Sequence, residues 1–315
     1  MSNRPSPPAH VARTRVDISL LKLSDRACLR LLQRGRVCTA TQLSNLLYPS
    51  QRTTLRRTRQ LWLKRLLNRE SLPAEQGGIP VAYRLSESGR RRLHLNPYRS
   101  PSLVTVRHQL DGVEFVTGIH REERGLVQLW WPESMIPNLG DGIHPDQLVI
   151  IDTGEASALF LVEVDESTER PPVIRERLNA YAKMFAVRHA GWYLIWVVNS
   201  PARLARLRQI AAPMEIANLT GRCWGVPIGE VGKLGGSAQV VTIGENLPPR
   251  TLRSLATDPK SRRTPYPVGS DAWIQLLADD GLEDIHELWH GVERKPAGSS
   301  EKPGSGRLDG DENGR

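Results

Sequence analysis

Residues 51–70 read QRTTLRRTRQLWLKRLLNRE. Apolar side chains recur at helical spacing within this stretch, which predicts an amphipathic helix over residues 51–69. Its expected apolar face consists of Leu55, Trp62, Leu63, Leu66 and Leu67. Seven Lys and Arg residues lie between Arg52 and Arg69, and no acidic residue in the stretch precedes Glu70. Because like charges repel along a helix, the opposite face favours a polyanion such as the DNA backbone as its partner.

The segments around this helix predict a small DNA-binding fold. A helix that ends at Gly35 and a second helix over residues 40–47 are expected ahead of it. A Gly-Gly turn behind it leads to an alternating strand over residues 81–85. Three helices followed by a hairpin predict a winged helix-turn-helix over residues 19–98. The Pro-rich residues 1–18 lack apolar periodicity and are expected to form a disordered arm.

The second helix of a helix-turn-helix enters the major groove, where polar side chains meet base edges. The contacts predicted for this helix are Arg52, Thr53, Arg56, Arg57 and Gln60. Further basic residues are expected beside the flanking backbone, and these are Arg84, Arg90, Arg91 and Arg92. The alternative is that these charged side chains form a solvated helix face with no ligand, which is more usual where acidic and basic residues are mixed. This helix has no acidic residue before Glu70. The expected partner is therefore double-stranded DNA.

The charge of the chain is segregated along its length. Residues 1–100 hold 20 of the 43 Lys and Arg but only 5 of the 34 Asp and Glu, which leaves 23 basic and 29 acidic residues in the remainder. A basic module joined to a mildly acidic one is typical of nucleic-acid binding by the first module. No apolar run is long enough to span a bilayer, and residues 1–15 lead into no signal-peptide core, so a cytoplasmic location is expected. The three cysteines form no CxxC pair and predict neither disulfides nor a thiolate zinc site.

The region after residue 100 predicts an α/β (mixed α+β) domain over residues 101–245. A helix over residues 104–119 precedes apolar runs at 127–131, 148–151, 159–164 and 193–198, and a helix that begins at Pro171-Pro172 lies between the last two runs. The order is αβββαβ. Runs that are apolar throughout indicate strands covered on both faces. A helical extension over residues 246–290 and a disordered tail over 291–315 are expected to follow.

Acidic residues stand at the ends of two of these apolar runs. Asp146 precedes one run, and Glu163 and Asp165 close the next. Burying a carboxylate is costly unless it is paired or binds a cation. If the two strands are antiparallel, Asp146 and Glu163 approach each other and can hold Mg²⁺. Alternatively, these residues are solvated strand-end acids or ion-pair partners of Arg175 or Arg177, and spacing does not choose between the two interpretations.

Pro145-Asp146 and Glu163-x-Asp165 within an αβββαβ order resemble the PD-(D/E)xK nuclease superfamily, which has a restriction-endonuclease-like fold. With the winged helix, the Trp130-Trp131 strand, and the string VEVDESTE leading into RERLNAYAKMF, residues 20–240 resemble the replication-relaxation family of plasmid and mobile-element proteins. This resemblance implies a DNA-binding protein of replication or relaxation with a nuclease-like domain. It also implies a metal-binding, catalytic role for Asp146 and Glu163.

One departure from the nuclease pattern bears on catalysis. The pattern has a Lys two positions after the Glu, where it would position or activate water, and this chain has Asp165. The family resemblance implies an acid there and a Lys on the following helix, near Arg177. Arginine stays protonated and is a poor proton acceptor, although it can stabilise a phosphorane electrostatically, and Lys183 is the other candidate. A metal-dependent nicking enzyme and a catalytically inactive DNA-binding regulator of replication or transcription therefore both remain open.

A third hypothesis comes from His286-Glu287-Leu288-Trp289-His290, which matches the HExxH pattern of zinc metallopeptidases. A catalytic zinc needs a third protein ligand, and no histidine follows His290. The more ordinary interpretation is a peripheral helix whose Leu282, Ile285 and Leu288 pack inward.

Overall fold

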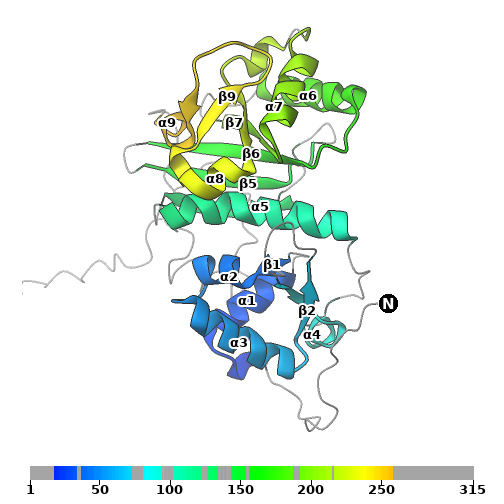
Figure 1. The fold of residues 1–315 in the computed structure, drawn as a ribbon, viewed down its shortest axis with the longest axis vertical. Coiled ribbons are helices and arrows are strands. Elements are labelled where there is room, and N and C mark those ends of the chain that lie inside the picture. The colour runs from blue at the N-terminus through cyan, green and yellow to red at the C-terminus, as the bar shows by residue number, and fades with distance from the viewer. Residues whose placement is uncertain are drawn as a thin grey trace, which may run out of the picture. The chain divides into compact units, whose positions relative to one another are not determined.

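The computed structural model describes residues 18–33, 37–72, 81–93, 95, 102–122, 126–133, 136, 139, 143–153, 156–186, 192–214 and 216–257. Within these ranges, helices pack on two separate β-sheets, which confirms the mixed α/β class (Figure 1). None of the described helices combines the length and apolar character that a membrane crossing requires. The predicted arm, most of the C-terminal extension, the tail and the HExxH segment lie outside the described residues.

The N-terminal part contains three main helices and a three-stranded antiparallel sheet with the strand order β1-β3-β2. Its elements are η1 (Ile18–Leu20), α1 (Leu23–Gln33), β1 (Cys38–Thr39), α2 (Ala40–Leu46), α3 (Gln51–Leu63), β2 (Leu67–Ser71), β3 (Val81–Leu85) and α4 (Glu87–Arg92). Side-chain caps fix three of the helix starts, because Thr39, Ser50 and Ser86 each accept a hydrogen bond from a backbone N–H of the first turn. The two predicted helices ahead of α3 are both present.

Helix α3 is shorter than the sequence pattern predicts. It ends at Leu63, and the chain then turns at Arg65, whose φ of 58° lies in the left-handed region. Leu66 and Leu67 are buried, but Leu67 begins strand β2 instead of extending the helix. Six residues of the predicted helix therefore form the turn and the strand, because the hairpin buries these leucines by pairing β2 with β3.

The buried face of α3 also differs from the predicted one. It consists of Thr54, Thr58 and Leu61, whereas Leu55 is 48% exposed. The two threonine hydroxyls donate hydrogen bonds to the carbonyl oxygens of Ser50 and Thr54, one turn earlier. Their polar groups are thus satisfied within the helix and their methyl groups can face the core. A hydrophobicity pattern counts threonine as polar, which is why it selected the wrong face.

The C-terminal part is a seven-stranded mixed sheet with the strand order β10-β9-β8-β7-β6-β5-β4. Its elements are α5 (Leu103–Glu122), β4 (Val127–Pro132), β5 (Gln147–Asp152), β6 (Ser157–Asp165), α6 (Pro171–Ala186), β7 (Trp192–Val198), α7 (Pro201–Ala211), η3 (Ala217–Leu219), β8 (Cys223–Pro227), α8 (Ile228–Leu234), η4 (Gly235–Ser237), β9 (Gln239–Thr242), β10 (Arg250–Thr251) and α9 (Leu252–Leu255). The predicted αβββαβ order is present from α5 to β7. Strands β4, β5 and β6 are antiparallel neighbours, and β6 is parallel to β7.

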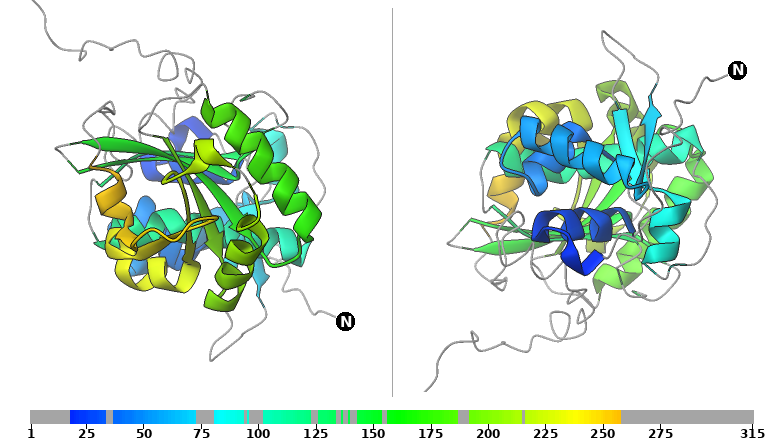
Figure 2. Two further views of the ribbon diagram at one scale, coloured as in Figure 1. Left: turned by 90° about the horizontal axis from the view of Figure 1, so that it is seen from above. Right: turned by 90° about the horizontal axis from the view of Figure 1, so that it is seen from below.

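Helices cover both faces of this sheet. Helices α5 and α8 lie on one face, and α6 and α7 lie on the other (Figures 1 and 2). Every residue of β5 is buried, as expected for a strand covered on both sides. The largest side chains of the core include four tryptophans that are almost completely buried, Trp130, Trp131, Trp196 and Trp224.

Helix α5 also contacts the N-terminal part. The buried Gln42 of α2 donates hydrogen bonds from its amide to the Leu110 carbonyl oxygen at 3.0 Å and to the Glu114 carboxylate at 3.2 Å. Val106 of α5 packs with Val37 and Ala82 in one apolar cluster. The same helix thus packs on the large sheet and against α2. The predicted boundaries at residues 19–98 and 101–245 stay predictions.

Candidate nucleic-acid interface and carboxylate centre

The exposed face of α3 carries three of the five DNA contacts predicted for this helix, Arg52, Arg56 and Gln60. Its exposed residues are Gln51, Arg52, Leu55, Arg56, Arg59 and Gln60. Arg52, Arg56 and Gln60 recur every four residues and therefore form one stripe along the helix. No carboxylate in the described ranges forms an ion pair with Arg52, Arg56 or Arg59. This face therefore presents positive charge that is not neutralised by those parts of the protein.

Arg57 lies on a different side of the helix and is engaged within the protein. Its guanidinium forms an ion pair with Asp25 of α1, and its Nε donates to Asp25 Oδ1 at 2.9 Å. Asp25 is completely buried and also accepts a hydrogen bond from the Tyr48 hydroxyl at 3.2 Å. Arg57 further donates from NH1 to Gln60 Oε1 at 2.7 Å. A buried carboxylate needs such a partner, so Arg57 stabilises the packing of α1 against α3.

Of the remaining predicted DNA contacts, some are engaged within the protein and at least one is exposed. Thr53 belongs to the N-terminal cap of α3, where its hydroxyl accepts from Ser50 at 3.1 Å. Arg84 is buried in β3 and pairs with Glu70 of the neighbouring strand at 2.5 Å, so its charge is neutralised within the sheet. Three further basic residues form the last turn of α4, and these are Arg90, Arg91 and Arg92. Of these, Arg91 is exposed and lies 3.7 Å from Glu87.

The second site contains the acidic residues at the strand ends. Antiparallel pairing places Gln147 of β5 opposite Val162 of β6, so the preceding Asp146 lies beside Glu163 and Val164. This confirms the antiparallel arrangement on which the predicted approach of the two acids depended. Asp146 Oδ2 accepts from the Val164 backbone N–H at 2.7 Å, and Oδ1 lies 2.8 Å from Nε2 of His108 on α5.

Glu163 lies at the centre of this cluster. Its side chain is 2% exposed and contacts Arg177 of α6 through Oε2 at 2.7 Å, while the Tyr181 hydroxyl donates to Oε1. Arg177 also reaches Glu169 at 2.6 Å. Burial above all, together with the neighbouring Asp146, raises the pKa of the Glu163 carboxyl to about 8, although Arg177 and Tyr181 act in the opposite direction. The cluster is therefore a buried polar network whose central acid retains its proton more readily than a solvated glutamate.

Asp165 has a partner of its own. Its side chain is 1% exposed and accepts two hydrogen bonds from Arg203 of α7, at 2.7 and 3.1 Å. The Ser167 backbone N–H donates to Asp165 Oδ1 at 2.8 Å. The position that a nuclease lysine would occupy is thus an acid bound by an arginine. No sequence pattern points to Arg203, because its role depends on the packing of α7 against the sheet.

The other residues that sequence analysis missed are His108 and Tyr181. Tyr181 follows Arg177 by four residues, which places both on one side of α6 facing Glu163. That spacing is visible in the sequence, but nothing in the sequence links Tyr181 to Glu163. His108 belongs to a different element and carried no comparable signal.

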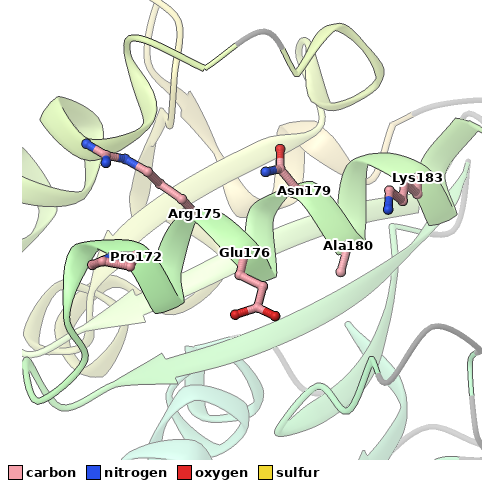
Figure 3. Close-up of a pocket in the computed structure, with 6 residues that line it drawn as sticks. All are labelled: Pro172, Arg175, Glu176, Asn179, Ala180 and Lys183. Carbon is pink, nitrogen blue, oxygen red and sulfur yellow. The ribbon is translucent and has the colours of Figure 1, made fainter.

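Lys183 lies on the outer side of α6, away from this cluster. The described residues that line a surface depression there are Pro172, Arg175, Glu176, Asn179, Ala180 and Lys183, and Figure 3 shows them along one helix. The structure thus brings Arg177, and not Lys183, to the Glu163 carboxylate. Arg175, the other predicted ion-pair partner, also belongs to this outer face.

Asp146, Glu163 and Asp165 form the carboxylate centre. Whether Mg²⁺ fits it depends on which of its oxygen atoms are available as ligands. Mg²⁺ binds through one or two carboxylates together with waters and phosphate oxygens. Asp146 and Glu163 each use both oxygens for hydrogen bonds within the protein, and the Arg177 guanidinium supplies positive charge beside Glu163. Where the chain is described, no three or more His, Cys, Asp and Glu residues are grouped so as to hold a metal ion. The donor set favours an arginine ion pair, and Mg²⁺ binding stays a prediction.

A comparison with protein-family models matches residues 29–193 to the family described as replication-relaxation, which is more than half of the 315-residue chain. The chain belongs to the replication-relaxation family. The matched region runs from α1 to the start of β7, so the replication-relaxation match includes both the basic helix α3 and the three acids of the carboxylate centre. Comparisons with curated proteins and with solved structures gave no match.

Proposed function

We propose that this replication-relaxation protein is a double-stranded DNA-binding factor of mobile-element replication, and that α3 is its recognition helix. The observation that carries the proposal is the exposed stripe of α3, on which Arg52 and Arg56 have no carboxylate partner among the described residues. Phosphate contacts dominate the affinity of DNA-binding proteins, and unpaired arginines on an exposed helix supply them.

The topology of the N-terminal part supports this role. The order α1, β1, α2, α3, β2, β3 is the order of a winged helix-turn-helix, in which the hairpin after the third helix is the wing. In that arrangement the last of the three helices enters the major groove. Leu55 adds to the argument, because an exposed leucine between arginines can contact a thymine methyl group.

We further propose that the C-terminal sheet is a nuclease-like domain that does not cut DNA. Two arginines support this second part of the proposal. Arg177 is bound to Glu163, which is an acid of the nuclease pattern, and Arg203 is bound to Asp165, which stands where that pattern has its lysine. Supercoiled plasmid incubated with the protein and Mg²⁺ or Mn²⁺ should stay supercoiled. If nicked product forms and is lost on Asp146→Asn substitution, the domain is a metal-dependent nuclease after all.

The DNA-binding proposal is tested by the salt dependence of duplex affinity. The double variant Arg52→Ala/Arg56→Ala removes two exposed cations from α3, so the slope of log K against log salt should flatten by about 2 units. Arg175→Ala/Arg206→Ala removes the same charge from exposed sites on α6 and α7 and serves as the matched control.

Comparison of the two variants shows whether DNA binding depends on the arginines of α3 or only on the net charge of the protein. Affinity and slope should change strongly for the α3 variant and little for the control. Equal effects from both variants would show that binding depends on net charge alone. No effect of the α3 variant, in a protein with native circular dichroism, would exclude α3 as the DNA contact.

A further inference from the structure

The network beneath α3 fixes one side chain on its exposed face. Asp25 is completely buried and is bound by Arg57 and Tyr48. Because an unpaired buried carboxylate is strongly unfavourable, the Arg57 guanidinium is held in place by Asp25. Its remaining NH1 group donates to Oε1 of the exposed Gln60 at 2.7 Å.

This contact determines which way the Gln60 amide points. A guanidinium has only hydrogen-bond donors, so the Gln60 atom that faces Arg57 must be the carbonyl oxygen. The amide nitrogen then points away from Arg57, and no acceptor for it is found among the described residues. Gln60 lies on the same stripe as Arg52 and Arg56, four residues beyond the latter.

A glutamine with both amide atoms free pairs with adenine, because its oxygen accepts from N6 while its nitrogen donates to N7. The hydrogen bond from Arg57 uses one lone pair of the Gln60 oxygen and turns that oxygen towards Arg57, so the oxygen and the nitrogen do not face a base together and the amide nitrogen is the outward group. The major-groove edge that offers two acceptors to a donor is that of guanine, through N7 and O6, while cytosine N4 only donates.

We propose that Gln60 is a specificity-determining residue that donates to a guanine in the major groove, and that Arg57 is a positioning residue that orients it. This inference rests on the proposed DNA-binding function of α3. It changes the predicted role of Arg57 from a DNA contact to a support for one.

The test begins with duplexes selected by the full-length protein from a randomised pool. Affinities are then measured for the best duplex and for its single-base-pair variants. At one position guanine should be preferred about threefold to tenfold, the range of a single hydrogen bond. Gln60→Ala should abolish the preference at that position. Gln60→Glu presents an outward acceptor, so the preference there should change to cytosine.

The role of Arg57 needs a variant that can fold. Arg57→Ala would leave Asp25 charged and buried, so the double variant Asp25→Asn/Arg57→Met, which removes both charges, is the appropriate one. With its oxygen released, Gln60 should shift the preference at the same position towards adenine. Circular dichroism and thermal melting check that the variant is folded, and Arg175→Ala/Arg206→Ala is the control for charge removal.

The outcomes separate this inference from the function on which it rests. If salt-dependent binding is lost in Arg52→Ala/Arg56→Ala but Gln60→Ala changes no base preference, α3 binds DNA and Gln60 does not read it. If the position controlled by Gln60 prefers adenine in the wild type, the orientation argument is wrong. If the wild type does not bind duplex DNA, both the function and the inference fail.

Discussion

Glu163→Gln should remove a large part of the pH dependence of stability. Burial raises the pKa of Glu163 in the folded state to about 8, compared with an ordinary value of 4.5. Between these values the folded protein binds a proton that the unfolded chain releases. The resulting stability is fully present below about pH 4.5 and is lost as pH rises through 8. One pKa unit corresponds to about 1.4 kcal/mol, so the loss has an upper bound of about 5 kcal/mol.

Glutamine keeps the shape of the side chain and cannot ionise, so the variant should lack this contribution. Urea denaturation followed by tryptophan fluorescence, from pH 4.5 to 9 in buffer with a chelator, measures the free energy of unfolding. The difference between variant and wild type should grow in favour of the variant with rising pH. Glu176→Gln, on the exposed side of α6, is the control and should parallel the wild type.

Parallel profiles for the wild type and Glu163→Gln would refute this reasoning, because they would show that Glu163 ionises similarly in the folded and unfolded states. Asp111 is a half-buried acid, whose pKa is raised to about 6 by its partial burial and by the neighbouring Glu166. It is present in every variant of the series, so its contribution cancels in the comparison.

Three further predictions concern packing, base contact and a buried ion pair. Gly118→Ala should destabilise the protein by about 1–3 kcal/mol in urea denaturation, because the added Cβ would lie 2.6 Å from a backbone carbonyl oxygen of α8. Gly229→Ala, where nothing lies within 4 Å, should be neutral or stabilising, and equal losses would contradict the steric argument. Leu55→Ala should weaken binding to a selected duplex about fourfold, and the loss should disappear on the same duplex made with deoxyuridine, which lacks the thymine methyl group. A loss that persists on deoxyuridine DNA would rule out the methyl contact. Arg203→Ala should cost about 3–5 kcal/mol by leaving Asp165 buried without its partner, and the double variant with Asp165→Asn should recover part of this loss by thermal melting.

The hydrophobic periodicity and the charge pattern of the sequence were sufficient to predict the order of the elements and the position of the basic helix. The αβββαβ order follows from apolar runs of strand length and from helices with a four-residue apolar repeat, both of which are local properties of the chain. The approach of Asp146 to Glu163 was also predictable, because antiparallel pairing of adjacent runs places the start of one beside the end of the other. The positive charge of α3 was predictable from its residue types alone.

The sequence by itself determined that α3 is cationic and that acids stand at the strand ends, since both depend on residue type and local spacing. Only the tertiary structure decided which of those charges are paired within the protein and which are left to bind a ligand. Arg52 and Arg57 look equivalent in the sequence, yet Arg57 is paired with Asp25, 32 residues away in the chain. Asp165 likewise meets Arg203 across 38 residues. A charge is neutralised by whatever packing brings within a few ångströms, and that distance is set by the fold and not by neighbours in the chain.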